Sequence, residues 1–496
     1  MSIDWIARSQ VLQLRVRNFV NGHWCEGGGD LVDKHSPRDG RLLCRFARAD
    51  SRVVEKAVLT ARRAFEDGRW SKLPTQSRKD ILHKLASLIE THTEELALLE
   101  CLDVGKPIRD ALTLDVPAAA AIIRFNAEAA DKFYGKVYGA DQSNLSYQLH
   151  RPLGVVVGIV GWNFPLFLAA MKIGPVLATG NSLILKPSEL TSFTAARVAE
   201  LAIEAGVPAG VFNVIHGRGD VGAALSHHRD VDGVSFTGST HTGKQLLIAS
   251  GKSNMKRLTL ECGGKAPNIV FDDCPNLESV ADAIVARAFW NQGQVCTASS
   301  RLLIQRSIKA ELLPLVIKKA AALSPGDPLS SETKFGALVS EEHKQKVLDY
   351  IHSGEREGAR IAYQSNSRAP FENGFYVAPV IFDQVSAEQR IAREEIFGPV
   401  LSVISFHDEA EAIRVANDTI YGLSAIVWTK NLGRAHRITQ GIKAGLVTVN
   451  ATENPIGGPG VGIMSVGGHK ESGLGAEGGV EGLEFYTSST AVQFFV

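Results

Sequence analysis

The chain has 496 residues, of which 45% are apolar, and its 53 Lys and Arg residues balance 53 Asp and Glu residues. This composition is that of a globular protein and excludes a disordered chain. The zero net charge argues against a nucleic-acid partner or an anionic membrane surface, since proteins that bind either carry a basic excess. At about 150 residues per domain, the length predicts about three structural units.

The six cysteines are widely spaced and include no Cys-x-x-Cys pair. A disulfide framework or a thiolate zinc site is therefore not expected, and we predict no metal. The first residues lack the basic segment and apolar run of a secretory signal peptide, which predicts a cytoplasmic protein.

The N-terminal part of the chain, about 130 residues, is predicted to be mostly helical. Apolar residues recur at helical spacing over residues 51–67 and 76–102, and Pro117 opens a further helix that reaches about Tyr134. Residues 138–148 alternate between apolar and polar side chains, which weakly favours a hairpin.

From Val155 onward, the pattern changes to alternating strands and helices, which predicts an α/β fold with a parallel sheet. Ligands bind such sheets at the carboxyl ends of the strands. A second β/α stretch covers residues 301–449 and a β-rich tail covers 484–496. The predicted strands are residues 155–160, 182–185, 211–215, 233–236, 257–260 and 268–271, with helices at 192–205 and 243–250 among those between them.

One apolar run, residues 153–171, is long enough to cross a bilayer. Glycines, Pro165 and the polar Asn163 interrupt it. We therefore expect a buried strand, a tight loop and a helix in place of a membrane span.

Two segments are candidates for binding phosphate. Residues 217–222 match Gly-x-Gly-x-x-Gly after a predicted strand, but the acid expected about 20 residues later is missing, so the match is weak. Residues 236–243 form a strand end, a turn of small residues and a helix start, where free backbone N–H groups could hold a pyrophosphate. Taken alone, this second segment favours an ordinary strand-to-helix turn.

Several polar residues follow predicted strands, and each also has a purely structural interpretation. Asn163 could cap the next helix, or its amide could donate to a developing oxyanion. Lys186 and Glu189 alone are typical of a surface turn, and Glu261 of a solvated or salt-bridged carboxylate. Cys296 could be a nucleophile, although most free cysteines are buried packing residues.

Together and in this order, these segments resemble the aldehyde dehydrogenase superfamily, and the resemblance covers almost the whole chain. The motifs that carry it are Phe19-Val-Asn-Gly22, Gly161-Trp-Asn-Phe-Pro165, Lys186-Pro-Ser-Glu189, Phe236-Thr-Gly-Ser-Thr240, Glu261-Cys-Gly-Gly-Lys265, Gly293-Gln-Val-Cys296, Glu394-Glu-Ile-Phe-Gly-Pro-Val400, Asn417-Asp-Thr-Ile-Tyr-Gly-Leu423 and Gly467-Gly-His-Lys-Glu-Ser-Gly473.

The resemblance implies a subunit of three parts with the active site between the first two. A Rossmann-like, parallel-sheet NAD-binding domain would comprise residues 1–133 and 153–262, and an α/β catalytic domain residues 263–470. Residues 134–152 and 471–496 would form a β oligomerisation arm, which implies a homodimer or homotetramer.

The resemblance also assigns the chemistry. Cys296 would attack the aldehyde to give a thiohemiacetal and, after hydride transfer, a thioester. The Asn163 side chain and the Cys296 backbone N–H would hold the oxyanion, and Lys172 would line the site. Glu261 would activate the hydrolytic water, which favours a free acid product, because relatives that transfer the acyl group to coenzyme A lack this Glu.

The implied cofactor is NAD, and relatives with the same ribose-binding Glu can also use NADP. Lys186 and Glu189 match the pair that holds the adenosine ribose. Trp162, Gly238 and Ser239 match adenine-side and pyrophosphate contacts, and Glu395 and Phe397 match the nicotinamide-ribose side. The residues expected to line the substrate tunnel are Phe164, Leu168, Met171, Trp290, Val295, Thr297 and Val466.

The chain departs from the family pattern near the site. Gly161 replaces a Pro, Cys262 replaces a Leu beside the base, and Val466 replaces an aromatic residue of the tunnel. A Gly- and Pro-rich insertion at residues 455–463 falls where relatives shape the substrate mouth, so the substrate cannot be transferred from them.

Residues 115–135 resemble the branch that oxidises amino-aldehydes such as γ-glutamylaminobutyraldehyde. The alternatives to a general aldehyde dehydrogenase are an acylating, semialdehyde-specific or amino-aldehyde-specific member and a non-catalytic relative. The second is disfavoured, since the Asn, Glu and Cys are all present.

Overall fold

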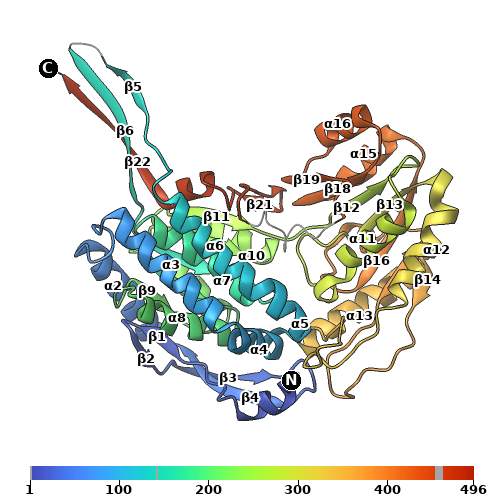
Figure 1. Ribbon diagram of the computed structural model, residues 1–496, viewed down its shortest axis with the longest axis horizontal. Helices are drawn as coiled ribbons and strands as arrows, with labels where there is room; N and C mark the ends of the chain where they lie inside the picture. The colour runs from blue at the N-terminus through green and yellow to red at the C-terminus, as the bar shows by residue number, and fades with distance from the viewer. Residues whose placement is uncertain (1–2, 141–142, 453–461, 496) are drawn as a thin grey trace.

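The computed structural model describes residues 3–140, 143–452 and 462–495. Figure 1 shows two α/β bodies, each built on its own sheet, and a β arm that projects from the first body. The α/β class predicted from the sequence is confirmed by this architecture.

The first sheet has eight strands in the order β2-β1-β9-β8-β7-β10-β11-β21. Its five central strands run parallel, and antiparallel strands close both edges. The strands are β1 (Asn18–Val20), β2 (His23–Cys25), β7 (Val155–Ile159), β8 (Ser182–Lys186), β9 (Phe212–Val214), β10 (Gly233–Thr237), β11 (Arg257–Glu261) and β21 (Gly473–Leu474).

Helices cover both faces of this sheet because successive strand side chains point to opposite sides. Val156 packs on the face covered by α3, α4, α6, α7 and α8, whereas Val155 and Val157 pack toward α2, α9 and α10. The helices are α2 (Ser51–Glu66), α3 (Thr75–Thr91), α4 (Thr93–Val104), α6 (Val116–Ala129), α7 (Pro165–Ala178), α8 (Phe193–Ala205), α9 (Gly219–His227) and α10 (Thr240–Lys252).

The second sheet has seven strands in the order β14-β15-β16-β13-β12-β18-β19, and only β14, at one edge, is antiparallel to its neighbour. Apolar clusters on its two faces bury the helices α11–α13, α15 and α16. The elements are β12 (Pro267–Val270), α11 (Leu277–Phe289), β13 (Arg301–Gln305), α12 (Lys309–Ala320), α13 (Glu341–Arg356), β14 (Arg360–Gln364), β15 (Val380–Asp383), β16 (Val400–Phe406), α15 (Glu409–Asn417), β18 (Ser424–Trp428), α16 (Leu432–Gly441) and β19 (Leu446–Val449).

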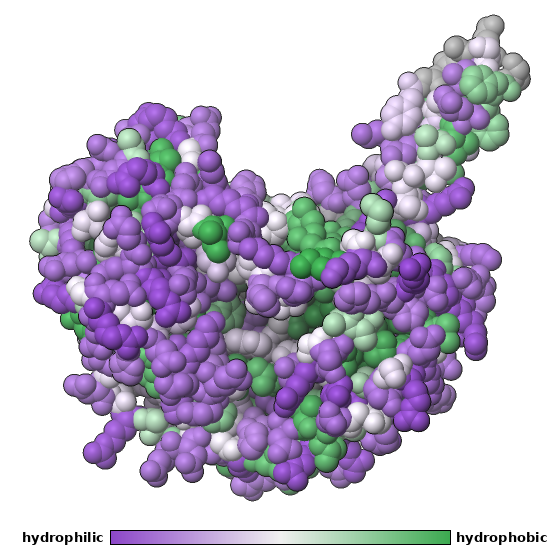
Figure 2. All heavy atoms as spheres, turned by 180° about the vertical axis from the view of Figure 1, so that it is seen from behind, coloured by the Kyte–Doolittle hydropathy of each residue, from purple (hydrophilic) through white to green (hydrophobic). Residues whose placement is uncertain are grey.

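The arm is a three-stranded antiparallel sheet of β5 (Val137–Ala140), β6 (Asn144–Pro152) and β22 (Thr487–Phe495). β22 pairs with β6 along its full length, from Thr487 opposite Pro152 to Phe495 opposite Asn144. Figure 2 shows apolar side chains on the surface of this arm. Val137, Tyr138 and Phe495, in its strands, are all exposed.

The predicted strands from residues 155 to 271 agree with β7 to β12 within one residue at each end. The prediction of a mostly helical N-terminal part was wrong before residue 51, where β1, β2, β3 (Gly28–His35) and β4 (Leu42–Ala49) are found. These strands are short, or exposed along much of their length, so they lack the apolar runs that mark a buried strand.

Two helix boundaries also differ from the prediction. The helix expected over 76–102 is two helices, α3 and α4, which meet at His92. The helix opened by Pro117 ends at Ala129 and continues a π-helical segment, Ala111–Asp115.

Residues 153–171 form β7, a loop and the start of α7, as expected. Within the described part of the chain, no helix combines the length and apolar character needed to span a bilayer. The cytoplasmic location stays a prediction.

Candidate active site

A cleft of about 810 Å³ lies at the carboxyl ends of β7, β8 and β10, and residues of the second body line its other side. Its size falls within the range of about 300–1,000 Å³ that is typical of small-molecule sites. The predicted site residues that it brings together are Trp162, Asn163, Phe164, Leu168, Lys186, Glu189, Gly238, Ser239, Val295, Cys296, Glu395 and Phe397.

Cys296 lies in the loop between a 3-10 turn (Trp290–Gly293) and β13. Asn291, Gln292 and Gly293 all have positive φ, at 47°, 57° and 71°, and this left-handed turn directs the chain into the cleft. A Cβ on Gly264 would lie 2.2 Å from the Cys296 carbonyl oxygen, so only glycine allows this close approach.

The Cys296 thiol is protonated at neutral pH. Burial raises its pKa to about 12, and the carboxylates of Glu395 and Glu261 act in the same direction. Backbone N–H groups of Thr297 and Cys296 itself face the sulfur and oppose the shift. Nucleophilic attack therefore needs an acceptor for the thiol proton.

Asn163 lies between β7 and α7 and is only 7% exposed. Its Nδ2 donates to the Gln294 carbonyl at 3.0 Å, and its own carbonyl accepts from Asn291 Nδ2 at 3.0 Å. The helix-cap alternative does not apply, because the N-cap residue of α7 is Phe164 and no side chain caps it from that position. An amide carries two N–H groups, so the second can serve an oxyanion in the cleft.

Glu261 ends β11, and the Gly468 backbone N–H faces its carboxylate. Burial raises the pKa of Glu261 well above the usual value, and the negative charge of Glu477 raises it further. Lys172 and the Gly468 N–H act against this shift. Its Oε1 has no hydrogen-bond partner among the described residues.

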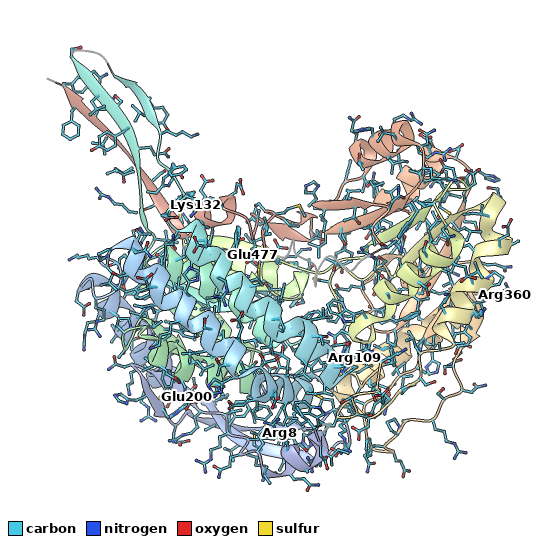
Figure 3. All side chains as sticks on the ribbon, viewed as in Figure 1. Arg8, Arg109, Lys132, Glu200, Arg360 and Glu477 are labelled. Carbon is cyan, nitrogen blue, oxygen red and sulfur yellow. The ribbon has the colours of Figure 1, made fainter. Side chains whose placement is uncertain are left out.

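Lys172 is fully buried in α7, where it forms an ion pair with Glu477. Glu477 also accepts a hydrogen bond from Ser235 Oγ at 2.9 Å, and Figure 3 marks its place near the centre of the molecule. Neither Lys172 nor Glu261 lines the cleft itself. Sequence reasoning missed Glu477, although a lysine in an apolar helix requires a buried carboxylate partner.

At the other end of the cleft, Lys186 Nζ lies 3.7 Å from the Glu189 carboxylate. Lys186 is 5% exposed, so the pair is a built part of the cleft and not a surface turn. Burial lowers the pKa of Lys186, and the charge of Glu189 opposes this shift.

The turn before α10 also lines the cleft. A Cβ at Gly238 would lie 2.5 Å from the Phe236 ring, and Ser239 Oγ accepts the Thr242 N–H at 3.2 Å as the helix cap. A 13-residue helix thus directs its positive end toward the cleft beside a carboxylate suited to ribose hydroxyls. These donors and acceptors fit a dinucleotide.

Trp162 packs edge-to-face against Phe397, with 5.1 Å between the ring centroids, and against His343 at 5.0 Å. It therefore lies beside a residue predicted for the nicotinamide-ribose side, whereas the sequence grouped it with adenine-side and pyrophosphate contacts. The carboxylate of Glu395 accepts the Gly264 N–H at 2.8 Å, which connects this part of the cleft to the Cys296 loop.

Phe164, Leu168 and Val295 line the cleft, as does Phe167, which was not predicted. The other four predicted tunnel residues lie elsewhere. Trp290 packs against Phe164 at 5.1 Å, Met171 lines a separate cavity of about 10 Å³, Thr297 contributes a backbone N–H toward the thiol, and Val466 pairs through its backbone with Glu477 at 2.8 Å.

Cys262, the unexplained thiol, lines the cleft and packs under the first turn of α10. Its sulfur would lie 2.8 Å from a Cβ on Gly243, so it fills space that a larger helix residue would need. Residues 455–461 of the insertion lie outside the described residues. No cluster of three or more His, Cys, Asp or Glu side chains in the described ranges could hold a metal ion.

The chain belongs to the aldehyde dehydrogenase family, whose model matches residues 24–492. It is 45% identical to the NADP/NAD-dependent aldehyde dehydrogenase PuuC of Escherichia coli, over 97% of this chain and 96% of that protein. It is 44% identical to an aminoacetaldehyde dehydrogenase of Pseudomonas aeruginosa, over 95% and 94% of the two chains.

Among solved structures, a mutant of the indole-3-acetaldehyde dehydrogenase AldA from P. syringae, in complex with NAD+ and IAA, is 46% identical. The match has a TM-score of 0.96 and covers 99% of each chain. The predicted family and enzyme class are thus confirmed.

Proposed function

We propose that this protein oxidises an aldehyde to the free carboxylic acid, with NAD+ as the preferred oxidant and NADP+ as a second one. The observation that carries the proposal is the placement of Cys296 and Asn163 in one cleft with the Lys186–Glu189 pair. The NAD+ complex of the AldA relative and the NADP/NAD-dependent relative support the choice of cofactor.

In the first step, the Cys296 thiol releases its proton to solvent, and the resulting thiolate attacks the carbonyl carbon and forms a thiohemiacetal. The carbonyl oxygen gains negative charge, which the second Asn163 N–H and the Cys296 backbone N–H stabilise. Removal of one such donor typically costs about 2.7–4 kcal/mol in transition-state stabilisation. Phe164, Leu168 and Val295 give this part of the cleft an apolar wall.

Lys186, Glu189 and the turn at Gly238 and Ser239 would hold NAD+, which would supply the acceptor for hydride from the thiohemiacetal carbon. This leaves a thioester on Cys296, which water must hydrolyse. Glu261 takes the proton from that water, and it can do so only when its carboxyl group is ionised. The opposing charges of Glu477 and Lys172 control how readily it ionises.

Single-turnover and steady-state kinetics test these roles. Cys296→Ala should have no dehydrogenase activity while still binding NAD+. Glu261→Gln should give a burst of NADH close to one equivalent, followed by slow turnover, because only hydrolysis is impaired. Unchanged steady-state turnover in Glu261→Gln would show that Glu261 is not the general base for hydrolysis. Formation of an acyl-coenzyme A product by the wild type would favour the acylating alternative.

Cofactor choice depends on Glu189, whose carboxylate accepts from a ribose 2′-OH and repels a 2′-phosphate. We expect Glu189→Gln to raise kcat/KM for NADP+ relative to NAD+, measured from initial rates. Aldehyde KM should not change, because the residue lies at the far end of the cleft. An unaltered cofactor ratio would contradict the assignment.

An amino-aldehyde is the second candidate substrate class, supported by the similarity to an aminoacetaldehyde dehydrogenase. The apolar side chains Phe164, Phe167, Leu168 and Val295 favour uncharged aldehydes instead. A panel from short aliphatic to aromatic to ω-amino aldehydes, scored by kcat/KM, separates the two classes.

The exposed arm supports a homodimer or homotetramer. β5, β6 and β22 present apolar side chains such as Tyr138 (62% exposed) and Phe495 (77%) on a sheet that projects from the body. In a monomer these apolar side chains stay exposed to water, whereas a second copy of the chain would bury them. Light scattering should give a dimer or tetramer mass, and Phe495→Asp should shift it toward the monomer.

A further inference from the structure

A buried ionic cluster lies behind the aldehyde side of the cleft and has no part in the mechanism above. Lys106 Nζ binds Asp115 Oδ2 at 2.5 Å, and their side chains are 2% and 3% exposed. Glu100, in α4, is fully buried nearby, and its pKa is raised to about 8 because burial outweighs the opposing charge of Lys106. Burial of three ionisable groups costs free energy of folding, so the contacts that these groups make must offset that cost.

The first contact of the cluster is with the aromatic wall of the cleft. The Lys106 ammonium lies 4.1 Å from the centroid of the Phe164 ring, which is the geometry of a cation–π interaction. Trp290 packs on the same ring at 5.1 Å. Phe164 directly follows Asn163, so the orientation of this ring is connected to that of the oxyanion donor.

The second contact is with the first turn of α7. The Glu100 Oε1 accepts the Leu166 N–H at 3.2 Å, and its Oε2 accepts from Thr194 Oγ1 at 3.3 Å. The N-cap residue of α7 provides no side-chain cap of its own. A carboxylate from a neighbouring helix therefore fills this role, and fixes where α7 begins.

We propose that Lys106 and Glu100 are positioning residues for aldehyde oxidation. They hold the Phe164 ring and the Leu166 backbone, in the segment that directly follows Asn163, and so fix the direction in which the Asn163 amide enters the cleft. The proposal rests on the proposed function. It predicts losses in the aldehyde reaction without losses in NAD+ binding or in the intrinsic reactivity of the Cys296 thiol.

The double variant Lys106→Met/Asp115→Asn tests the ring contact, because it removes both charges of the ion pair together. Glu100 keeps its hydrogen bonds to the Leu166 N–H and Thr194 Oγ1 in this variant. We expect kcat/KM for an aromatic aldehyde to fall by about tenfold or more. NAD+ affinity and the alkylation rate of Cys296 should remain unchanged. The matched control Lys309→Met/Asp383→Asn breaks another ion pair with a 2.5 Å separation, far from the cleft, and should leave kcat/KM unchanged.

Lys106→Arg keeps a cation against the ring and should retain most of the activity. Glu100→Gln keeps the acceptor for the Leu166 N–H and should also be close to wild type, whereas Glu100→Leu should lose kcat with little change in NAD+ affinity. These single variants decide the question even if the double variant does not fold, as judged by circular dichroism.

Wild-type kcat/KM in a folded double variant, or equal losses in Glu100→Gln and Glu100→Leu, would overturn the proposal. A parallel loss of NAD+ affinity would do the same, since it would indicate a general structural role. Absence of aldehyde oxidation in the wild-type protein is a different result, and it would count against the proposed function itself.

Discussion

The Cys296 thiol should become steadily more reactive as the pH rises, without reaching a plateau below pH 10. Its pKa of about 12 has burial as the main cause and the Glu395 charge as the next. At that pKa, the thiolate fraction is about 1 in 10⁵ at pH 7 and about 1 in 10³ at pH 9. A thiol with the ordinary pKa of about 8.5 would change from about 3% to about 76% ionised over the same interval.

Alkylation by iodoacetamide in the absence of cofactor measures this difference. The rate of modification of the Cys296 peptide, followed by mass spectrometry from pH 6.5 to 10, should rise about tenfold per pH unit, because only the thiolate reacts. Reporting on the peptide separates Cys296 from Cys25 and Cys44, which are also partly exposed. A plateau near pH 8.5 would refute the argument from burial.

Glu395→Gln gives the same assay a second test. The variant removes the largest charge that raises the thiol pKa, while an amide oxygen can still accept the Gly264 N–H. Alkylation at pH 8 should therefore be faster than in the wild type. A slower or equal rate would mean that the carboxylate does not act on the sulfur.

Two further predictions concern the base and the glycine beside the nucleophile. Glu261 has a raised pKa, so its ionised form, and with it the hydrolysis rate, increases as the pH rises. Glu477→Gln should shift this rising limb of kcat to lower pH and Lys172→Met to higher pH, and shifts in the same direction would contradict the charge argument. Gly264→Ala places a Cβ 2.2 Å from the carbonyl of the nucleophile and should lower kcat by about 100-fold. Gly251→Ala in α10, with no neighbour within 4 Å, should instead add about 0.5–1 kcal/mol to the unfolding free energy measured with denaturant, and a loss of stability there would contradict the open space around it.

The central strands of the first sheet could be predicted from the sequence because they are buried on both faces. β7 and β8 are continuous runs of buried residues. The Gly or polar residues that follow each run show where the strand ends. The helix over 76–102 was not divided correctly, because its apolar spacing continues across His92 while the backbone there departs from helical geometry. Local periodicity does not detect a break of one residue.

The candidate site was predictable where a residue lies within a motif, as Asn163 does after β7 and Cys296 does before β13. The partners of those residues were not, since they come from distant parts of the chain. Glu477 is 305 residues from Lys172, so no pattern of neighbouring residues predicts that the two form an ion pair. Trp290 and Met171, which were expected in the tunnel, do not line the cleft: Trp290 packs on the Phe164 ring and Met171 lines a separate cavity. Their apolar character alone does not say which cavity such side chains face.

Residues 473–495 complete structures that begin much earlier in the chain. β21 closes the edge of the first sheet, Glu477 neutralises Lys172, and β22 forms most of the arm with β6. During translation, Lys172 in the apolar helix α7 therefore has no Glu477 partner until residue 477 has left the ribosome. We therefore expect the first body to reach its full stability only after residue 477 is in place. A chain truncated near residue 470 would leave the Lys172 ammonium unpaired and should be less stable and more readily degraded.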